Sequence, residues 1–422
     1  MNSTYLISRV TQLKALASRY YYDFLNGLLM LTVFISTFHH KLTKKLAIII
    51  LIIAAIKYID FKMLKKLLQE PIVRVILLTF SYMALSLLWT PDFHEGKGIV
   101  ENYIFYFMLP ILVFALIPDQ KYIYLLVKTF VFAMVINELI SYGILFGVWG
   151  ELNDQGYPTP FLHHTLYSVL VIIAIFIIGY ELTRAKSIIS RLFYLLFLLT
   201  MSGNLIISGG RNGQVTLFLI VLVLAVSHFR RSYKKALLLL FAPILIFAVA
   251  YFSYDQFQER LKLIYTDSIA VVEQQNFRTS LGNRLFSYFL AEKYMQDYNY
   301  LIGEGAGSVK ITKNTIIEKH FADAYQNAER YSHFHQYYIS TLVQYGLIGL
   351  VLLVLMFYYL YKIKIKDPQL HYIKNVTLLV IIISDTADGM LFIRAMMVVF
   401  AIFIGLALAQ QRVEQDSLKR SF

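Results

Sequence analysis

The sequence predicts an all-α polytopic integral membrane protein that carries one large, mainly helical extramembrane loop. Of its 422 residues, 58% are hydrophobic and only 15% are charged, whereas soluble globular domains carry about 25% charged residues. Almost uninterrupted apolar runs recur along the chain, and with their flanks they reach the roughly 17–25 residues that cross a bilayer. Residues 255–334 interrupt this pattern with a long polar stretch. The pattern therefore indicates a membrane domain with a folded insertion.

The apolar runs divide into about twelve transmembrane helices, given a hydrocarbon core roughly 30 Å thick. Nine of these spans are predicted in residues 1–254, the loop occupies residues 255–334, and residues 335–422 hold the last three spans and a tail. The approximate limits of the spans are Phe24–Phe38, Lys44–Ile59, Ile72–Trp89, Ile99–Ile117, Tyr122–Trp149, Thr165–Tyr180, Ile188–Ser208, Asn212–His228, Lys235–Tyr254, Gln336–Ile363, Tyr372–Gly389 and Leu391–Leu408.

Charge predicts the orientation of these spans. With the N-terminus inside, lysines and arginines gather in the connections that then face the cytoplasm, at positions 62–74, 184–191, 230–235 and 362–366. This is the positive-inside pattern. The two tryptophans, Trp89 and Trp149, fall at predicted outer span ends, as an aromatic belt requires. One connection disagrees, because it would place lysines outside at positions 41, 44 and 45. The sequence thus predicts cytoplasmic termini and a large loop on the outer side.

Composition argues against several other classes of protein. The net charge of +13 is spread over many short connections, so membrane insertion and contact with anionic lipid explain it better than nucleic-acid binding does. Cysteine is absent, which excludes disulfides, thiol catalysis and Cys-ligated metal. No Asp-x-Asp pair occurs, so a metal-held nucleotide-sugar donor is unsupported, and we expect no cofactor and no metal.

Within the loop, Phe257–Tyr265 and Arg284–Gln296 have helical patterning. Large apolar side chains in the second segment recur at helical spacing, at Leu285, Tyr288 and Phe289. The glycine-rich run at positions 303–307 then breaks the pattern. It is similar to a phosphate-binding loop, but no strand–turn–helix unit surrounds it. We therefore expect a sharp turn at this run.

Arg211 lies in a tight glycine-rich turn between two very hydrophobic spans, on the predicted outer side. An arginine at a span end can simply extend to lipid headgroups and cap a helix. The positive-inside bias nevertheless disfavours a lone arginine outside, and flanking glycines let the backbone approach a ligand closely. A guanidinium fork suits a diphosphate held at the membrane surface, so both interpretations stay open.

Arg278 and Arg284 lie in the insertion, at the start of its second predicted helix. For Arg278 we favour a solvated helix start with Ser280 as the N-cap. Arg284 begins the helix beside its aromatic face, where a positioned role is nearly as plausible as a solvated one. A second cation would help to neutralise a diphosphate leaving group.

His335 is the best candidate for proton transfer. It begins an apolar span at the predicted lipid–water boundary, on the same side as Arg211 and Arg284. Histidine ordinarily titrates near pH 6.5, which suits a general base. His333 would point to a different helix face, and zinc ligation by the two histidines would need an extended backbone and a further ligand. We therefore favour a base over a metal site.

Two further groups lie at predicted outer span ends. Asp385, Asp388 and Arg394 cluster between the last two spans, where a functional role and mutual ion pairing are equally plausible. His163 and His164 precede a span and could contact a substrate, although we favour a plain interfacial role for them.

Three segments resemble the O-antigen ligase and polysaccharide polymerase superfamily. Ile207-Ser208-Gly209-Gly210-Arg211-Asn212-Gly213 is similar to the family's small-residue-plus-arginine turn before a membrane helix. Ser280-Leu281-Gly282-Asn283-Arg284 resembles the start of its loop signature, which continues here in Tyr288, Ala291, Gly303, Gly305 and Gly307. His335-Gln336-Tyr337-Tyr338 is similar to its histidine–asparagine helix start, with Gln336 in place of the asparagine, and is followed by the glycine-leucine run Gly346-Leu347-Ile348-Gly349.

The resemblance implies a membrane glycosyltransferase of the GT-C type that uses a metal-independent, inverting mechanism. Its donor would be a glycan on undecaprenyl diphosphate at the periplasmic leaflet of the bacterial inner membrane, and the acceptor of a ligase would be a sugar hydroxyl of lipid A-core. His335 would be the base, and Arg211 and Arg284 would bind the diphosphate. Further substrate contacts are expected at Arg278, His333, Gln336, Tyr338, Asp388 and Arg394.

The same resemblance covers other activities. An O-antigen or polysaccharide polymerase would use a second lipid-linked glycan as acceptor, and a protein O-oligosaccharyltransferase is a third alternative. A lipid-linked glycan transporter would instead have repeated halves and interrupted helices with polar groups at mid-membrane, whereas the polar candidates here gather at the outer face. The loop signature as a whole favours the ligase.

Overall fold

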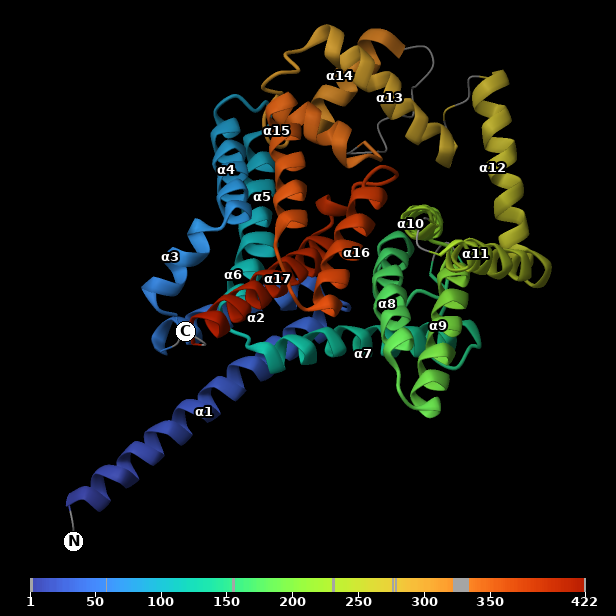
Figure 1. Cartoon of the computed structure of the whole chain (residues 1–422). Coiled ribbons are helices and arrows are strands. Elements are labelled where there is room, and N and C mark those ends of the chain that lie inside the picture. Colours follow the sequence, from blue (N-terminus) through green and yellow to red (C-terminus); the bar gives the residue numbers. More distant parts are fainter. Residues whose placement is uncertain are drawn as a thin grey trace.

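The computed structural model describes residues 3–57, 59–153, 156–229, 232–274, 277, 279–321 and 334–420. Within these residues the chain forms helices and no strands, which confirms the predicted all-α class (Figure 1). The α-helices are α1 (Ser3–Ser36), α2 (His40–Lys57), α3 (Phe61–Gln69), α4 (Pro71–Leu85), α5 (Phe93–Asn102), α6 (Leu109–Leu116), α7 (Gln120–Leu145), α8 (His164–Arg184), α9 (Ile188–Ile207), α10 (Arg211–Phe229), α11 (Tyr233–Ser253), α12 (Asp255–Gln274), α13 (Ser280–Asp297), α14 (Val309–Phe321), α15 (Tyr337–Lys362), α16 (Pro368–Ser384) and α17 (Arg394–Arg420).

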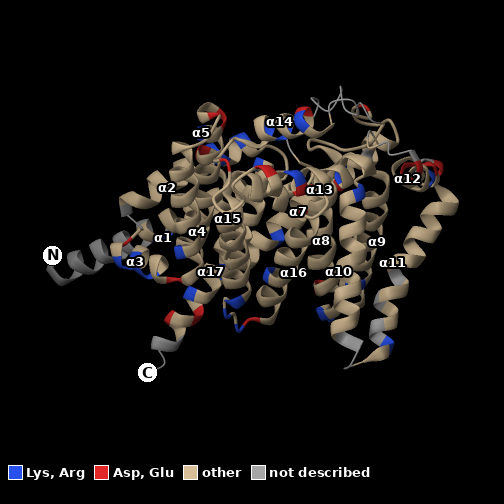
Figure 2. Cartoon of the chain, turned by 90° about the horizontal axis from the view of Figure 1, so that it is seen from above, with Lys and Arg blue, Asp and Glu red and all other residues tan. Residues whose placement is uncertain are grey.

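Seven helical stretches of the described chain are long and apolar enough to cross a membrane, so the chain is a multi-pass membrane protein, as predicted. Charged residues gather along two opposite edges of the molecule and leave a mostly uncharged band between them (Figure 2). The other five predicted spans coincide with α1, α2, α10, α11 and α16, whose crossing of a membrane stays a prediction. The seven stretches are Pro71–Leu88, Phe93–Leu116, Gln120–Leu145, His164–Arg184, Ile188–Ile207, Tyr337–Lys362 and Arg394–Ser417.

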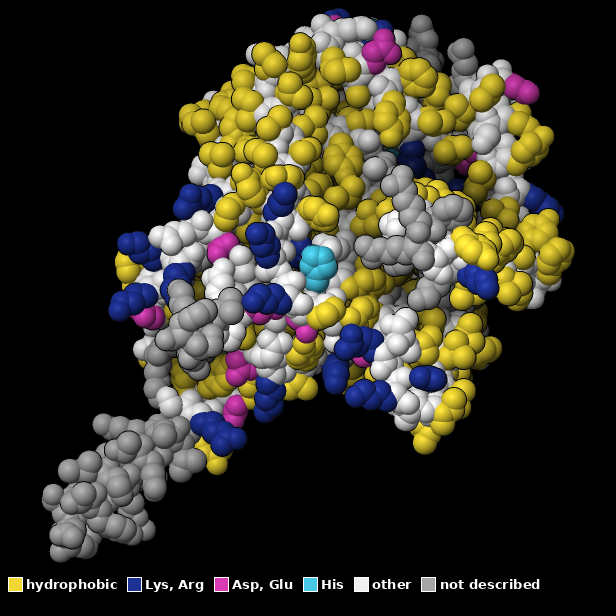
Figure 3. Space-filling model, viewed as in Figure 1, with side chains coloured by type: hydrophobic (Ala, Val, Ile, Leu, Met, Phe, Trp, Pro, Cys, Tyr) yellow, Lys and Arg dark blue, Asp and Glu magenta, His cyan; other side chains and the backbone are white. Residues whose placement is uncertain are grey.

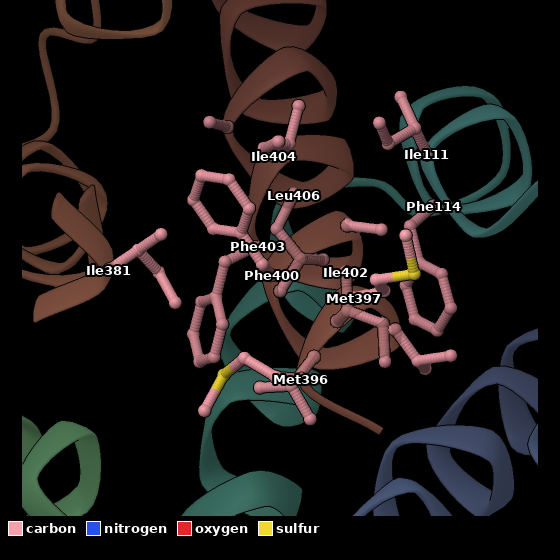
Figure 4. Close-up of a cluster of buried hydrophobic side chains, with 14 of the residues drawn as sticks. Ile111, Phe114, Ile381, Met396, Met397, Phe400, Ile402, Phe403, Ile404 and Leu406 are labelled. Atoms are coloured by element: carbon pink, nitrogen blue, oxygen red, sulfur yellow. The ribbon is translucent and has the colours of Figure 1, made fainter. Parts of the chain in front are cut away.

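Helix α17 lies at the centre of the hydrophobic core (Figure 4). Its side chains Met396, Phe400 and Phe403 are buried, and they lie between α6 on one side and α16 on the other. Gly405 lets α6 approach closely, because a Cβ at this position would lie 2.6 Å from the Cβ of Phe114. An apolar sequence on all faces of a helix is expected of a helix that is surrounded by others.

The insertion contains three helices, α12, α13 and α14, of which the sequence predicted the first two with shorter limits. The predicted N-cap of α13 is wrong by one residue, since the Thr279 side chain accepts a hydrogen bond from the Gly282 N–H at 3.0 Å. The predicted apolar face of α13 is also wrong. Leu285, Tyr288 and Phe289 are exposed, whereas Phe286, Leu290 and Tyr294 are buried in a second cluster that joins α13 and α14 to the start of α15.

The glycine run at 303–307 joins the insertion to two membrane helices, and it forms the sharp turn that the sequence predicts. Gly303, Gly305 and Gly307 all have positive φ. A Cβ on Gly303 would lie 2.4 Å from the backbone N of Gly346, where α15 is itself kinked with φ +62°. The indole N–H of Trp89, beyond the end of α4, donates to the Gly303 carbonyl at 3.0 Å. The insertion is therefore held to α4 and α15 by backbone contacts that only glycine permits.

Candidate functional site

Arg211 is the first residue of α10, directly after the turn at Gly209 and Gly210. The space beside these glycines is filled by the protein itself. A Cβ on Gly209 would lie 2.3 Å from the Tyr157 ring, and one on Gly210 would lie 2.2 Å from the Ser168 Oγ. The glycines thus allow the start of α10 to pack closely against Tyr157 and α8, and a close approach of this backbone to a ligand stays a prediction. Arg211 itself is half-buried.

The beginning of α10 is also fastened to the end of α16. The Asn212 side chain is buried, and its Nδ2 donates a hydrogen bond to the Ser384 carbonyl at 3.1 Å. Buried amides of this kind are costly to leave unpaired, so the contact fixes where Arg211 starts. It also brings Arg211 close to the turn that follows α16, at residues 385–389.

Arg284 lies on α13 and reaches the same turn. Its Nε donates a hydrogen bond to the Ala387 carbonyl at 2.8 Å, and the side chain is half-buried. Burial lowers the pKa of Arg284, with the charge of Arg211 acting in the same direction and that of Asp388 opposing it. Arg284, Arg211 and Asp388 therefore interact electrostatically, although they come from three separate parts of the chain.

His335 stands just before α15 and faces Asp388. The His335 Nδ1 lies 3.7 Å from the Asp388 Oδ1, and the two side chains are 22% and 17% exposed. The same carboxylate oxygen accepts the Gly389 N–H at 3.0 Å. Burial raises the pKa of Asp388, but hydrogen bonding and charge from His335, together with the charge of Arg284, outweigh it and lower the pKa. The structure thus pairs the predicted base with an ionised carboxylate.

The ion-pair interpretation of the Asp385, Asp388 and Arg394 cluster is not supported. Asp388 faces His335, whereas the Asp385 Oδ1 accepts the Leu391 N–H at 3.1 Å. The Asp385 backbone carbonyl in turn accepts the Tyr337 N–H at 3.1 Å. The guanidinium of Arg394 lies 5.8 Å from the centre of the Tyr106 ring, so it points toward the π-helical segment Tyr103–Met108.

Gln336 and Tyr338 make contacts within the protein. The Gln336 side chain caps α15 by accepting the Ile339 N–H at 2.8 Å, and its Nε2 donates to the Tyr288 hydroxyl at 3.2 Å. The Tyr338 hydroxyl donates to the Ile382 carbonyl of α16 at 2.8 Å. These contacts position the start of α15, and the predicted substrate contacts of both residues stay predictions. Arg278 and His333 lie outside the residues that the structure describes.

His164 is a further candidate site residue, for which the sequence favoured a plain interfacial role. Its ring interacts electrostatically with Asp388, Arg211 and Arg284, and it packs 4.0 Å, centre to centre, from the ring of His163. Its Nδ1 is buried and has no hydrogen-bond partner among the described groups. The available signal was its place directly before a span, on the same predicted side as the arginines.

The arrangement brings two guanidinium groups, an imidazole–carboxylate pair and a second histidine to one end of the helix bundle. Two guanidinium groups can bind a multiply charged oxyanion such as a diphosphate, and an imidazole beside a carboxylate can accept a proton. Within the described residues, no group of three or more His, Cys, Asp or Glu side chains is arranged to hold a metal ion.

Residues 196–354 match the sequence model of the O-antigen ligase family. No curated protein matches the chain. The matched segment contains Arg211, Arg284 and His335, whereas His164 precedes it and Asp388 follows it.

Proposed function

On the match of residues 196–354 to the sequence model of the O-antigen ligase family, we propose that the chain is an O-antigen ligase. Members of this family transfer glycans and use lipid-linked glycans as substrates. In the proposed reaction, a glycan moves from undecaprenyl diphosphate to a sugar hydroxyl of lipid A-core. The loop signature with its arginine, aromatic residue, alanine and glycines favours this activity over polymerisation.

The proposed step is a single inverting displacement. The acceptor hydroxyl oxygen attacks the anomeric carbon of the donor glycan, the bond from this carbon to the diphosphate oxygen breaks, and undecaprenyl diphosphate leaves. The hydroxyl proton passes to His335. We assign this proton to Nε2, since Nδ1 faces Asp388. The carboxylate would then stabilise the imidazolium that forms, in the manner of other base–carboxylate pairs.

Arg211 and Arg284 are the proposed diphosphate ligands. The leaving group gains negative charge as the bond breaks, and preorganised cations at such a position can supply the largest part of catalysis. The Ala387 carbonyl accepts a hydrogen bond from the Arg284 Nε, which anchors this side chain to the turn after α16. Metal ions are not required in this scheme.

One observation carries the proposal. The two arginines and the His335–Asp388 pair come from α10, α13, the start of α15 and the turn after α16, yet they interact electrostatically with one another. These separate elements bring cations and a candidate base together at one end of a set of membrane helices. Such an arrangement suits chemistry on a lipid-linked anion. We further propose that the chain has about twelve membrane spans, given a bilayer core of roughly 30 Å, and that its fold is of the GT-C type. In this proposal both termini are cytoplasmic and the site is periplasmic.

The test is the surface lipopolysaccharide of a deletion strain complemented with wild type, Arg211→Ala, Arg284→Ala or His335→Ala. A ligase predicts core-only lipopolysaccharide and accumulated lipid-linked glycan in the deletion strain, with variants that reach normal membrane levels but do not restore ligation. If single repeat units still reach the core, the protein is a polymerase. Full complementation by all three variants would refute the site.

A further inference from the structure

Helix α3 is a short amphipathic helix between α2 and α4, in a connection that sequence analysis treated only as a source of positive charge. The Asp60 side chain caps it by accepting the Lys62 N–H at 3.1 Å. Leu64, Leu67 and Leu68 share one face, and Lys62, Lys65 and Lys66 share the other, because residues three and four apart are neighbours on a helix. Such a helix suits the surface of a membrane.

The leucine face of α3 closes an apolar cavity. The cavity has a volume of about 340 Å³, which lies in the range of roughly 300–1,000 Å³ typical of ligand sites. Its walls come from α2, α3, α4, the π-helical segment and α6, and every lining side chain is apolar. These are Leu51, Leu64, Leu67, Leu68, Val73, Ile76, Leu77, Ile104, Met108, Leu109, Ile111 and Leu112.

Arg74 borders this cavity, and Lys65 lies on the helix that closes it. Arg74 is exposed on α4 between the lining residues Val73 and Leu77, and its Nε donates to the Leu68 carbonyl at 3.3 Å. Lys65 is exposed on α3 beside Leu64 and Leu68. Lysine and arginine side chains gather over α3, next to the hydrophobic surface of the neighbouring helices (Figure 3). An apolar cavity with cations at its border is complementary to a lipid that has an anionic headgroup.

We propose that this cavity binds one acyl chain of an anionic glycerophospholipid, whose phosphate group contacts Arg74 and Lys65. The guanidinium keeps terminal N–H donors for a phosphate while its Nε holds the Leu68 carbonyl. None of the proposed catalytic residues lines this cavity, whose walls include α4 from Val73 to Leu77. The site is therefore separate from the proposed catalytic site and selects a membrane lipid, not the glycan donor.

Native mass spectrometry of the full chain, released from micelles that contain equal amounts of phosphatidylglycerol and phosphatidylcholine with identical acyl chains, tests this proposal. We expect wild type to retain phosphatidylglycerol over phosphatidylcholine by about tenfold or more, since each basic residue at a membrane surface contributes about 1 kcal/mol. Lys65→Gln/Arg74→Gln should lose most of this preference. The matched control, Lys97→Gln/Lys310→Gln, removes two exposed lysines elsewhere and should keep it.

A second variant distinguishes binding of the acyl chain from binding of the headgroup. Leu77→Trp fills the cavity, and we expect it to lower retention of both lipids, whereas the charge variant should affect only the anionic lipid. The proposal is overturned if wild type has no preference for the anionic lipid, or if the preference survives in the Lys65→Gln/Arg74→Gln protein. It is equally overturned if a polyisoprenyl diphosphate displaces phosphatidylglycerol at equal concentration, because the cavity would then belong to the donor.

Discussion

Replacing Asp388 with asparagine should slow glycan transfer while leaving the shape of the site unchanged. The amide oxygen of asparagine can still accept the Gly389 N–H that the carboxylate accepts at 3.0 Å. What the substitution removes is the negative charge beside His335. If His335 takes the proton of the acceptor hydroxyl, this charge stabilises the imidazolium in the transition state, and its loss raises the barrier.

The size of the effect follows from the distance. Unit charges that are 3.7 Å apart, as Nδ1 and Oδ1 are, attract by about 1 kcal/mol in water and by about 4.5 kcal/mol at an effective dielectric constant of about 20. The side chains are 22% and 17% exposed, so we take a value between these limits, about 2–3 kcal/mol. The expected loss in rate is therefore about 30- to 150-fold.

A double-mutant cycle on purified protein decides whether Asp388 acts through His335. Transfer from a lipid-linked glycan donor would be measured for wild type, Asp388→Asn, His335→Ala and the double variant, across a range of pH. We expect the double variant to be no slower than His335→Ala alone, because the carboxylate has nothing to stabilise once the imidazole is gone.

Two results would refute this reasoning. If the losses of the single variants multiply in the double variant, Asp388 does not act through His335. If Asp388→Asn keeps the wild-type rate at every pH while His335→Ala is inactive, the carboxylate has no part in proton transfer. A single cooperative thermal melt of Asp388→Asn in detergent is the control for folding.

Three further predictions concern residues around the site. Arg284→Ala should lower the rate of glycan transfer by about 10²–10³-fold. Arg284→Lys should have an intermediate rate, because it keeps the charge but loses the Nε hydrogen bond to Ala387 and the guanidinium fork. Equal activity of the two variants would contradict this. Gly346→Ala should destabilise the protein by at least about 1–3 kcal/mol, the cost of a backbone conformation that essentially only glycine adopts, since its φ is +62° and its ψ is −162° and the Cβ would meet the Leu301 carbonyl. The control Gly27→Ala has open space and should not destabilise it in a thermal melt. Folding lowers the pKa of Asp388, so its carboxylate stabilises the protein at pH values above the unfolded pKa of about 3.9. This stabilisation is lost as the pH falls through the lower folded pKa. The melting temperatures of wild type and Asp388→Asn should therefore converge at acidic pH.

The membrane helices were predictable because each depends mainly on local apolar sequence. The predicted span Ile188–Ser208 differs from α9 by one residue, and the apolar content of α8 located that helix to within a few residues. Such runs carry their own signal, since burial in lipid or among other helices requires only apolar side chains. Helix α3 was not predicted, because its nine residues are amphipathic and lie between two stronger patterns.

The candidate site was predictable in its members but not in its pairings. Arg211 and His335 were identified by residue type and by their place at predicted span ends, and Arg284 by its place at the start of a predicted helix in the insertion. These are local properties. The Asp388–His335 contact joins positions far apart in the chain, and the sequence suggested an ion pair with nearby Arg394 because neighbours in sequence are the natural first guess. The sequence did not indicate the role of His164 for the same reason, because its electrostatic partners come from distant parts of the chain.

The turn after α16 has a consequence for how the protein matures. This short segment supplies the Ala387 carbonyl to Arg284, the Asp388 carboxylate to His335 and the Asp385 carbonyl to the Tyr337 N–H. It is made late in synthesis, after α10, α13 and the start of α15 have left the ribosome. A partly made chain therefore holds the arginines and the histidine without the segment that orients them. The site becomes complete only when the last membrane helices have been inserted and docked, so the proposed transfer cannot begin before assembly of the protein is finished.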